Sequence, residues 1–150
     1  MAFRNIVREG DPVLRKVSRP VEQFDERLWT LLDDMAETLY RAEGAGLAAP
    51  QVGILRRVVV IDVGEGLIEL INPVIIKKSG RQEEVEGCLS CPGQSGITRR
   101  PKRVTVQAQD RHGNPITLSG EGLLARAFCH ELDHLDGILF KDHAVRMLEQ

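Results

Sequence analysis

The residues best suited to chemistry lie late in the chain, in the stretch CHELDHLDG at positions 129–137. If this stretch is helical, His130 and His134 share one face, because residues four apart are neighbours on a helix. Glu131 then lies beside them without pointing at the same ion. Two imidazoles that hold a metal ion, with a carboxylate that takes a proton from water, are the parts of a metal-dependent hydrolase. The alternative is two core or surface histidines that happen to share a face.

A catalytic site of this kind needs a third protein ligand. The chain ends before the downstream glutamate of thermolysin-like peptidases, and in the pattern HExxHxxGxxH the last histidine position holds Phe140. His143 does not fit that spacing either. The remaining candidate is Cys88, upstream in EGCLSCPG, although a single cysteine is more often a small buried hydrophobic residue. A thiolate and two imidazoles leave a fourth position open for water.

The three cysteines, Cys88, Cys91 and Cys129, cannot all pair within one chain. In a reducing compartment, metal binding or catalysis explains them better than a disulfide. The CxxC formed by Cys88 and Cys91 is typical of a redox pair or of half a zinc ribbon, but no second CxxC follows. We expect Cys91 and Cys129 to be inert small side chains.

Two helices are expected to frame the site. Residues 24–44 carry apolar side chains at helical spacing, with Asp25 as N-cap and Gly44 as the C-terminal stop. Residues 120–137 form the second helix, which carries the histidines and is closed by Gly137. The segment 44–53, GAGLAAPQVG, is rich in small residues and broken by proline, and is expected to be a loop.

Strands are expected between the helices, at residues 56–63, 67–78, 83–90, 102–110 and 115–119. Pro73 indicates an edge strand or an irregularity, and RHGN at 111–114 indicates a hairpin turn. In 102–110, Val104 and Val106 are expected to face one side of the sheet. Hairpins between two separated helices predict an α+β fold, with antiparallel strands around a central metal-binding helix and an N-terminal amphipathic helix.

Composition excludes several classes of function. The length of 150 residues fits one domain, and 42% hydrophobic and 28% charged residues are typical of a globular protein. A net charge of −2 gives no basic surface for nucleic acid and no charged tail for a membrane. Because no stretch resembles a signal peptide or a membrane span, we expect a cytoplasmic protein.

Three motifs together resemble the peptide deformylase family, whose patterns are GxGxAAxQ, EGCxS and HExDH. Here they read GAGLAAPQ at 44–51, EGCLS at 86–90 and HELDH at 130–134, in the same order. The resemblance extends over nearly the whole chain. Cys91 and Cys129 depart from it, since the family more often has an apolar β-branched residue and a glutamine there.

The resemblance implies that residues 1–150 form a single catalytic metallohydrolase domain. It implies that Cys88, His130 and His134 bind one divalent ion per chain, with Fe²⁺ in the cell and Zn²⁺, Ni²⁺ or Co²⁺ as alternatives. By the same resemblance, Glu131 is the general base, and the Gln51 side-chain amide and the Leu89 backbone N–H stabilise the oxyanion.

The implied substrate is the N-formylmethionyl end of a nascent polypeptide, from which formate is released. Gly44, Ala45, Gly46 and Ala127 are the implied substrate-binding residues, the glycines serving close approach or a turn with positive φ. The resemblance also implies transient contact with the ribosome in a bacterial cytoplasm. We expect Asp133 to brace the helix, and Glu86 to pair with Arg99 or Arg100.

Two other functions stay open on the residues alone. A zinc peptidase shares HExxH but lacks a well-placed third ligand. A structural zinc module needs a fourth protein ligand, which Cys91 or Cys129 would have to supply, and has no use for Glu131 or Gln51.

Overall fold

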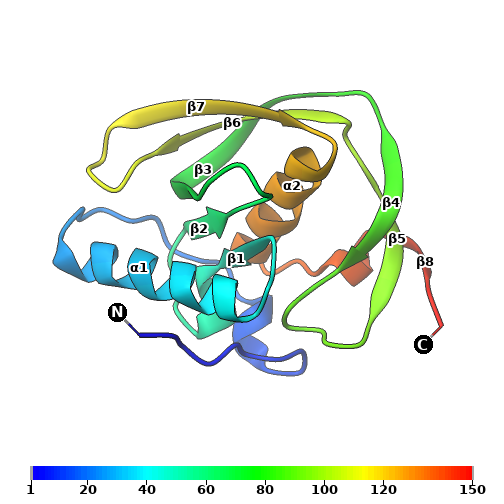
Figure 1. The fold of residues 1–150 in the computed structure, drawn as a ribbon, viewed down its shortest axis with the longest axis horizontal. Helices are drawn as coiled ribbons and strands as arrows, with labels where there is room; N and C mark the ends of the chain where they lie inside the picture. Colours follow the sequence, from blue (N-terminus) through cyan, green and yellow to red (C-terminus); the bar gives the residue numbers. More distant parts are fainter. Residues whose placement is uncertain (1, 150) are drawn as a thin grey trace.

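The computed structural model describes residues 2–149, and Figure 1 shows their arrangement. The helices are α1 (Glu26–Arg41) and α2 (Leu123–Leu135), with 3₁₀ turns η1 (Pro12–Arg15), η2 (Ala49–Val52) and η3 (Phe140–Asp142). The strands within this part of the chain are β1 (Gly46–Ala48), β2 (Val58–Ile61), β3 (Ile68–Ser79), β4 (Gln82–Gly87), β5 (Ser95–Arg100), β6 (Arg103–Gln109), β7 (Pro115–Glu121) and β8 (Ala144–Met147).

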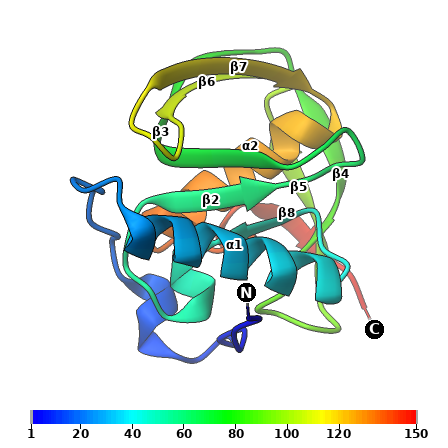
Figure 2. The same cartoon turned by 60° about the vertical axis from the view of Figure 1, so that its left-hand side comes forward.

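The strands form two antiparallel sheets, which makes the fold α+β as expected. One has the order β1-β2-β3-β6-β7 and the other β4-β5-β8. Helix α2 packs between β6 and β7 on one side and β1 and β2 on the other, and α1 covers the far side of β1 and β2, as Figure 2 shows. Nine residues of α2 are buried, which fits its central position. Neither helix of the described residues combines the length and apolar character needed to cross a bilayer.

Strand β2 separates two hydrophobic cores. Its side chains alternate: Val59 and Ile61 pack in the cluster that contains α2, whereas Val58 and Val60 pack in the cluster that contains α1. All four are completely buried. A strand covered on both faces needs no polar side, so its sequence is a continuous β-branched run.

Both helices end in a Schellman motif, in which the residue with positive φ is Glu43 after α1 and Gly137 after α2. Asp25 caps α1 as expected, accepting from the Leu28 N–H at 3.3 Å. The left-handed residue after α1 is Glu43 (φ 56°), and Gly44 only donates its N–H to the Leu39 carbonyl. The assignment of Gly44 as the C-terminal stop was therefore one residue late. After α2 the left-handed residue is Gly137, as expected.

Other expectations about the strands need correction. Residues 44–53 are not a loop, because they form β1 and η2. Pro73 is not on an edge strand, since β3 pairs with both β2 and β6, but the irregularity is confirmed by a register shift between Ile71 and Val74. Val104 and Val106 are both buried, as their alternation predicted. Strands β5 and β8 were not predicted.

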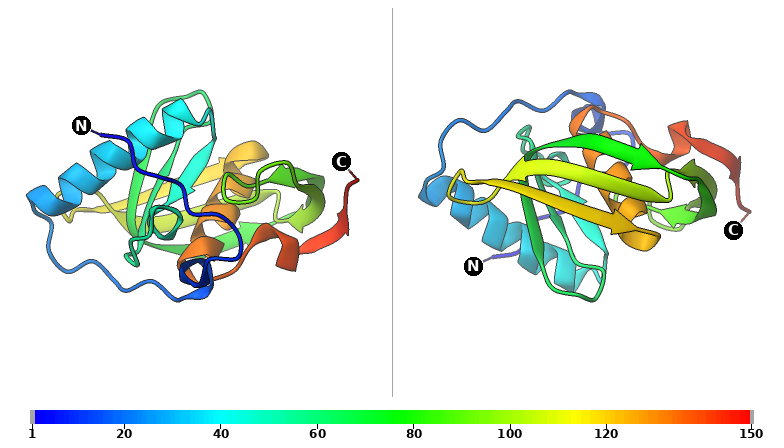
Figure 3. Two further views of the ribbon diagram at one scale, coloured as in Figure 1. Left: turned by 90° about the horizontal axis from the view of Figure 1, so that it is seen from below. Right: turned by 90° about the horizontal axis from the view of Figure 1, so that it is seen from above.

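The N-terminal lead-in crosses the underside of the molecule, drawn in dark blue in the left view of Figure 3. Its backbone joins two segments that are far apart in sequence: the Val7 N–H donates to the Gln51 carbonyl at 2.7 Å, and the Glu9 N–H donates to the Ser90 carbonyl at 2.8 Å. These bonds hold η2 against the turn that begins at Cys88.

Candidate metal centre

Three side chains from two elements converge on one point. Cys88 is the first residue after β4, and His130 and His134 lie on α2. One donor atom of each lies within 4.8 Å of the other two. The Cys88 Sγ is 3.3 Å from the His134 Nε2. A thiolate and two imidazoles at this spacing fit a tetrahedral divalent ion with one position left for a small molecule.

Glu86 orients the first of the two histidines. The His130 Nδ1 lies 2.6 Å from the Glu86 Oε2, so an Nδ1–H that donates to this carboxylate leaves Nε2 free for the ion. Burial opposes the charge of Glu86, but the hydrogen bonds from His130 and Arg100 outweigh it and lower the pKa of the carboxyl to about 2. Glu86 therefore remains ionised in its buried position.

Arg100 links this carboxylate to the far side of α2. Its guanidinium donates from Nη2 to the Glu86 Oε2 at 2.7 Å and from Nη1 to the Asp133 Oδ2 at 2.8 Å. The expected pairing of Glu86 with Arg100 is confirmed, and so is the bracing role of Asp133. Arg99 instead pairs with Glu83 on the exposed face.

The second histidine is held neutral. Burial, followed by the neighbouring His130, lowers the pKa of His134 to about 3. An imidazole must be deprotonated on the nitrogen that binds a metal, so this environment suits a ligand. Its Nδ1 is buried without a hydrogen-bond partner among the described residues.

Glu131 is buried beside the histidines, with one free oxygen. Its Oε1 has no hydrogen-bond partner within residues 2–149, and its Oε2 is 3.9 Å from the His130 Nε2. Burial raises the pKa of Glu131 to about 7. A Cβ on Gly46 would lie 2.6 Å from the Glu131 Oε2, so glycine is required there for close approach. Of the two roles considered for Gly44 and Gly46, the turn with positive φ is excluded, because neither residue has a positive φ.

The Gln51 amide lies next to the cysteine ligand. Gln51 is 1% exposed and its Oε1 accepts from the Ala48 N–H at 3.0 Å, which fixes the amide orientation. Its Nε2 donates to the Ser90 Oγ at 3.1 Å and lies 3.6 Å from the Cys88 Sγ. The backbone N–H of Leu89 has no hydrogen-bond partner among the described residues. Both candidate donors thus flank Cys88.

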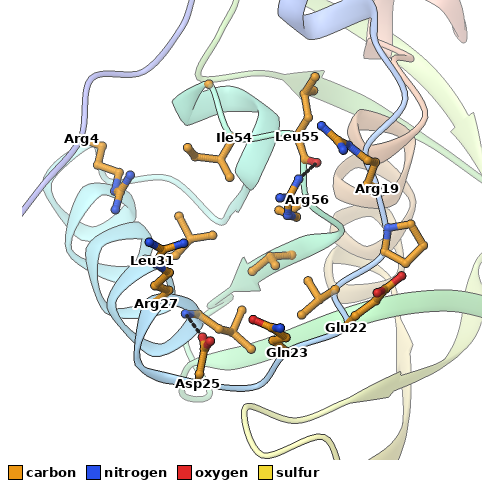
Figure 4. A pocket seen from close by; sticks show the side chains of 15 residues that line it. Arg4, Arg19, Glu22, Gln23, Asp25, Arg27, Leu31, Ile54, Leu55 and Arg56 are labelled. Atoms are coloured by element: carbon orange, nitrogen blue, oxygen red, sulfur yellow. Dashed lines mark hydrogen bonds between the residues drawn. The ribbon is translucent and has the colours of Figure 1, made fainter.

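A hollow of about 350 Å³ opens onto Cys88, His130 and Glu131, whereas Gln51 and His134 are not among its lining residues. Its lining includes all four expected substrate-binding residues, Gly44, Ala45, Gly46 and Ala127. Arg126 also lines it, and donates to the Gln82 Oε1 at 2.9 Å. A larger hollow of about 810 Å³ lies between the lead-in, the start of α1 and the segment after η2 (Figure 4). None of the expected site residues lines that second hollow.

The other two cysteines do not join the ligand cluster. Cys91 and Cys129 are buried, and neither belongs to the group of Cys88, His130 and His134. Burial raises the pKa of Cys91 to about 12 and that of Cys129 to about 11, so both stay neutral thiols. His143 points elsewhere, its Nε2 lying 3.4 Å from the Asp133 Oδ2.

A model of the polypeptide deformylase family matches residues 3–150. The chain belongs to this family. Among peptide deformylases, that of Acetivibrio thermocellus is 60% identical over 150 residues, which cover 100% of this chain and 88% of the relative. The peptide deformylase of Alkaliphilus metalliredigens is 60% identical over 146 residues, 97% of this chain and 99% of the relative. As a deformylase the chain is a metal-dependent hydrolase.

Solved deformylase structures have the same fold. The crystal structure of the enzyme from Thermotoga maritima superposes with a TM-score of 0.94 at 43% identity, over 96% of this chain and 99% of that one. The enzyme from Legionella pneumophila gives a TM-score of 0.92 at 48% identity, over 95% and 86%. In this chain, Cys88, His130 and His134 form a cluster that could hold the metal ion of a deformylase.

Proposed function

We propose that the chain hydrolyses the formamide bond of N-formylmethionyl nascent polypeptides, with one divalent ion held by Cys88, His130 and His134. The family supports removal of an N-terminal formyl group from nascent peptides. The observation that carries the detailed proposal is the ligand cluster with a partnerless carboxylate oxygen of Glu131 beside it. A bound divalent ion supplies a Lewis acid that acidifies water and polarises a carbonyl.

Glu131 is the general base in this proposal. Its Oε1 is buried and free to accept a proton, and a pKa raised to about 7 lets the carboxyl both take and return a proton near neutral pH. The proton taken from water passes to the leaving amine when the bond between carbon and nitrogen breaks. The products are formate and a free N-terminal amine.

Gln51 and Leu89 stabilise the oxyanion in this proposal. The Gln51 Nε2 is anchored beside Cys88, and the Leu89 N–H has no competing acceptor among the described residues. Neutral donors fixed before the reaction stabilise developing charge without reorganisation. They also do not compete with the protein ligands for the cation.

The substrate backbone lies along the free edge of β1. Among the described residues this strand pairs with β2 alone. On its other edge the Ala48 N–H is bonded to the Gln51 Oε1, and the backbone groups of Gly46 are available for an added strand. Gly46 brings that edge against Glu131, and Ala45 and Ala127 line the hollow where the methionine side chain is proposed to bind. The small side chains leave room for the long thioether.

The proposal also covers the metal ion, the contact with the ribosome and the bounds of the catalytic domain. We propose Fe²⁺ as the ion in the cell, while Zn²⁺, Ni²⁺ and Co²⁺ suit the same ligands. Residues 1–150 are proposed to act as a single catalytic domain, with transient ribosome contact in a bacterial cytoplasm.

The test is formate release from formyl-Met-Ala-Ser by protein prepared anaerobically with Fe²⁺. Acetyl-Met-Ala-Ser is expected to remain intact, and Glu131→Gln is expected to lower the rate by about 10²–10⁴-fold while the ion stays bound. Metal content is measured on the same samples. If folded, metal-loaded protein released no formate, the proposed reaction would be wrong. If Glu131→Gln released formate as fast as the parent, the role of Glu131 as general base would be wrong.

A further inference from the structure

Cys88 and Cys91 begin and end one tight turn. The Cys91 N–H donates to the Cys88 carbonyl at 2.9 Å, which is the hydrogen bond that closes a β-turn. The end residues of a β-turn have Cα atoms less than about 7 Å apart. A disulfide requires Cα atoms about 4.4–6.8 Å apart. The turn therefore brings the two cysteines into the range in which they can be bridged without unfolding the segment.

The two thiols differ sharply in access. Cys88 is half-buried and lines the hollow of about 350 Å³, so a small molecule that enters the hollow reaches its sulfur. Cys91 is 1% exposed and does not line the hollow. An oxidant therefore meets Cys88 first. The buried sulfur of Cys91 lies on the same turn as Cys88 and away from the hollow.

We propose that Cys91 is a resolving thiol, and that Cys88 and Cys91 form a reversible disulfide under hydroperoxide stress. The Cys88 sulfur attacks the hydroperoxide, the oxygen–oxygen bond breaks, an alcohol (or water) leaves, and Cys88 becomes a sulfenic acid. The Cys91 sulfur then attacks the sulfenic sulfur, a sulfur–sulfur bond forms, and the hydroxyl leaves with the Cys91 proton as water. Two thiols lose two electrons, and the hydroperoxide gains them.

Two consequences follow for the site. A disulfide sulfur is no longer a thiolate ligand, so the ion is left with His130 and His134 and is released. Because the sulfenic acid is captured, Cys88 is protected from further, irreversible oxidation to sulfinic acid. The release of the ion rests on the proposed metal site, whereas the disulfide itself does not.

Cys129 provides a matched control. It is also buried, but it packs in the hydrophobic cluster of α2, β2 and β6 with Val59 and Phe128. It lies on the helix, outside the turn, so Cys129→Ala removes a thiol without touching the Cys88 and Cys91 pair. Cleavage after Arg81 and Arg99 places Cys88 and Cys91 in one tryptic peptide and leaves Cys129 in another.

The experiment treats the purified, metal-loaded protein with hydrogen peroxide and then maps its peptides by mass spectrometry. In the wild type and in Cys129→Ala, the 82–99 peptide is expected to lose about 2 Da and to recover it with dithiothreitol. In Cys91→Val, which places an apolar β-branched residue there, Cys88 is expected to gain about 32 Da as sulfinic acid, which dithiothreitol does not reverse. Released ion is followed with a coloured chelator.

Three results would overturn the proposal: Cys88 reaching sulfinic acid equally fast in the wild type and in Cys91→Val, a disulfide to Cys129, or three intact thiols after excess peroxide. Cys91→Ser replaces Cys91→Val if the latter does not fold, and the wild-type peptide map decides the matter without any variant. A disulfide in a protein that releases no formate would refute the proposed function and support this inference.

Discussion

Glu86 contacts the candidate metal ligand His130 without belonging to the ligand cluster itself. Its pairing with an arginine was expected from charge alone, but no chemistry followed from that. The structure adds the short contact from the Glu86 Oε2 to the His130 Nδ1, 2.6 Å. Sequence could not reveal it because Glu86 and His130 are far apart along the chain, and only the packing of the β4-β5-β8 sheet against α2 brings them together. The position of Glu86 within EGCLS was the available clue.

The metal affinity of a Glu86→Gln variant tests this role. The neutral amide still fits the space, but it no longer holds the Nδ1 proton with a charge. We expect the dissociation constant for Zn²⁺ to rise by about 10–100-fold, measured by competition with a chelator. Glu83→Gln is the control, since Glu83 lies on the same strand but pairs with Arg99 at the surface. Equal affinities in the two variants would contradict the orienting role of Glu86.

At the scale of elements, the periodicity of apolar residues predicted the helices and the long strands, whereas short polar strands were missed. The two helices and the strands around 56–63, 67–78 and 102–110 follow from apolar patterns that burial imposes. Strand β5 has the sequence SGITRR, in which the buried Arg100 reads as a surface residue until its partners Glu86 and Asp133 are known. Strand β1 is three residues long, and two of its residues, Gly46 and Ala48, are small and typical of a loop.

The left-handed residue after α1 offers a stability test at this scale. Glu43 has φ 56°, a conformation that glycine adopts without strain. We expect Glu43→Gly to raise the free energy of unfolding by about 1 kcal/mol. Urea titration followed by circular dichroism measures it.

The opposite change at the end of α2 is the control. Gly137 has φ 75°, and a Cβ there would lie 2.5 Å from the Arg15 carbonyl oxygen. Gly137→Ala should therefore destabilise by more than Glu43→Gly stabilises. If Glu43→Gly proved destabilising, the favourable effect assigned to the helix end would be wrong.

For the whole molecule, the stability of the folded protein depends on pH through two buried carboxyls, Glu131 and Glu86, which act in opposite directions. Burial raises the pKa of Glu131 from 4.5 to about 7, so the folded metal-free protein binds this proton more tightly than the unfolded chain. Its stability then falls as pH rises from 4.5 to about 7. Glu86, with a pKa lowered from 4.5 to about 2, contributes stability that is lost as pH falls through that range.

We therefore expect Glu131→Gln to flatten the neutral part of the pH profile of the metal-free protein. At pH 8 the variant should be more stable than the parent by up to about 3 kcal/mol. Below pH 4.5 the two proteins should be similar. Denaturant unfolding at a series of pH values measures the stability of the variant and of the parent. Parallel curves of stability against pH for the two proteins over the whole range would show that the Glu131 pKa is not raised.

The N-terminal lead-in crosses the underside of the molecule and contacts residues that are made much later. Arg15 pairs with Asp142, 127 positions later, and Glu9 pairs with Lys141. The N-terminal segment thus gains these contacts only when residues about 130 positions later are in place. Contacts of such separation slow folding, since a long loop must close before they form. A protein proposed to process newly made chains would itself need a long stretch of its own chain to be made before this part of its fold is complete.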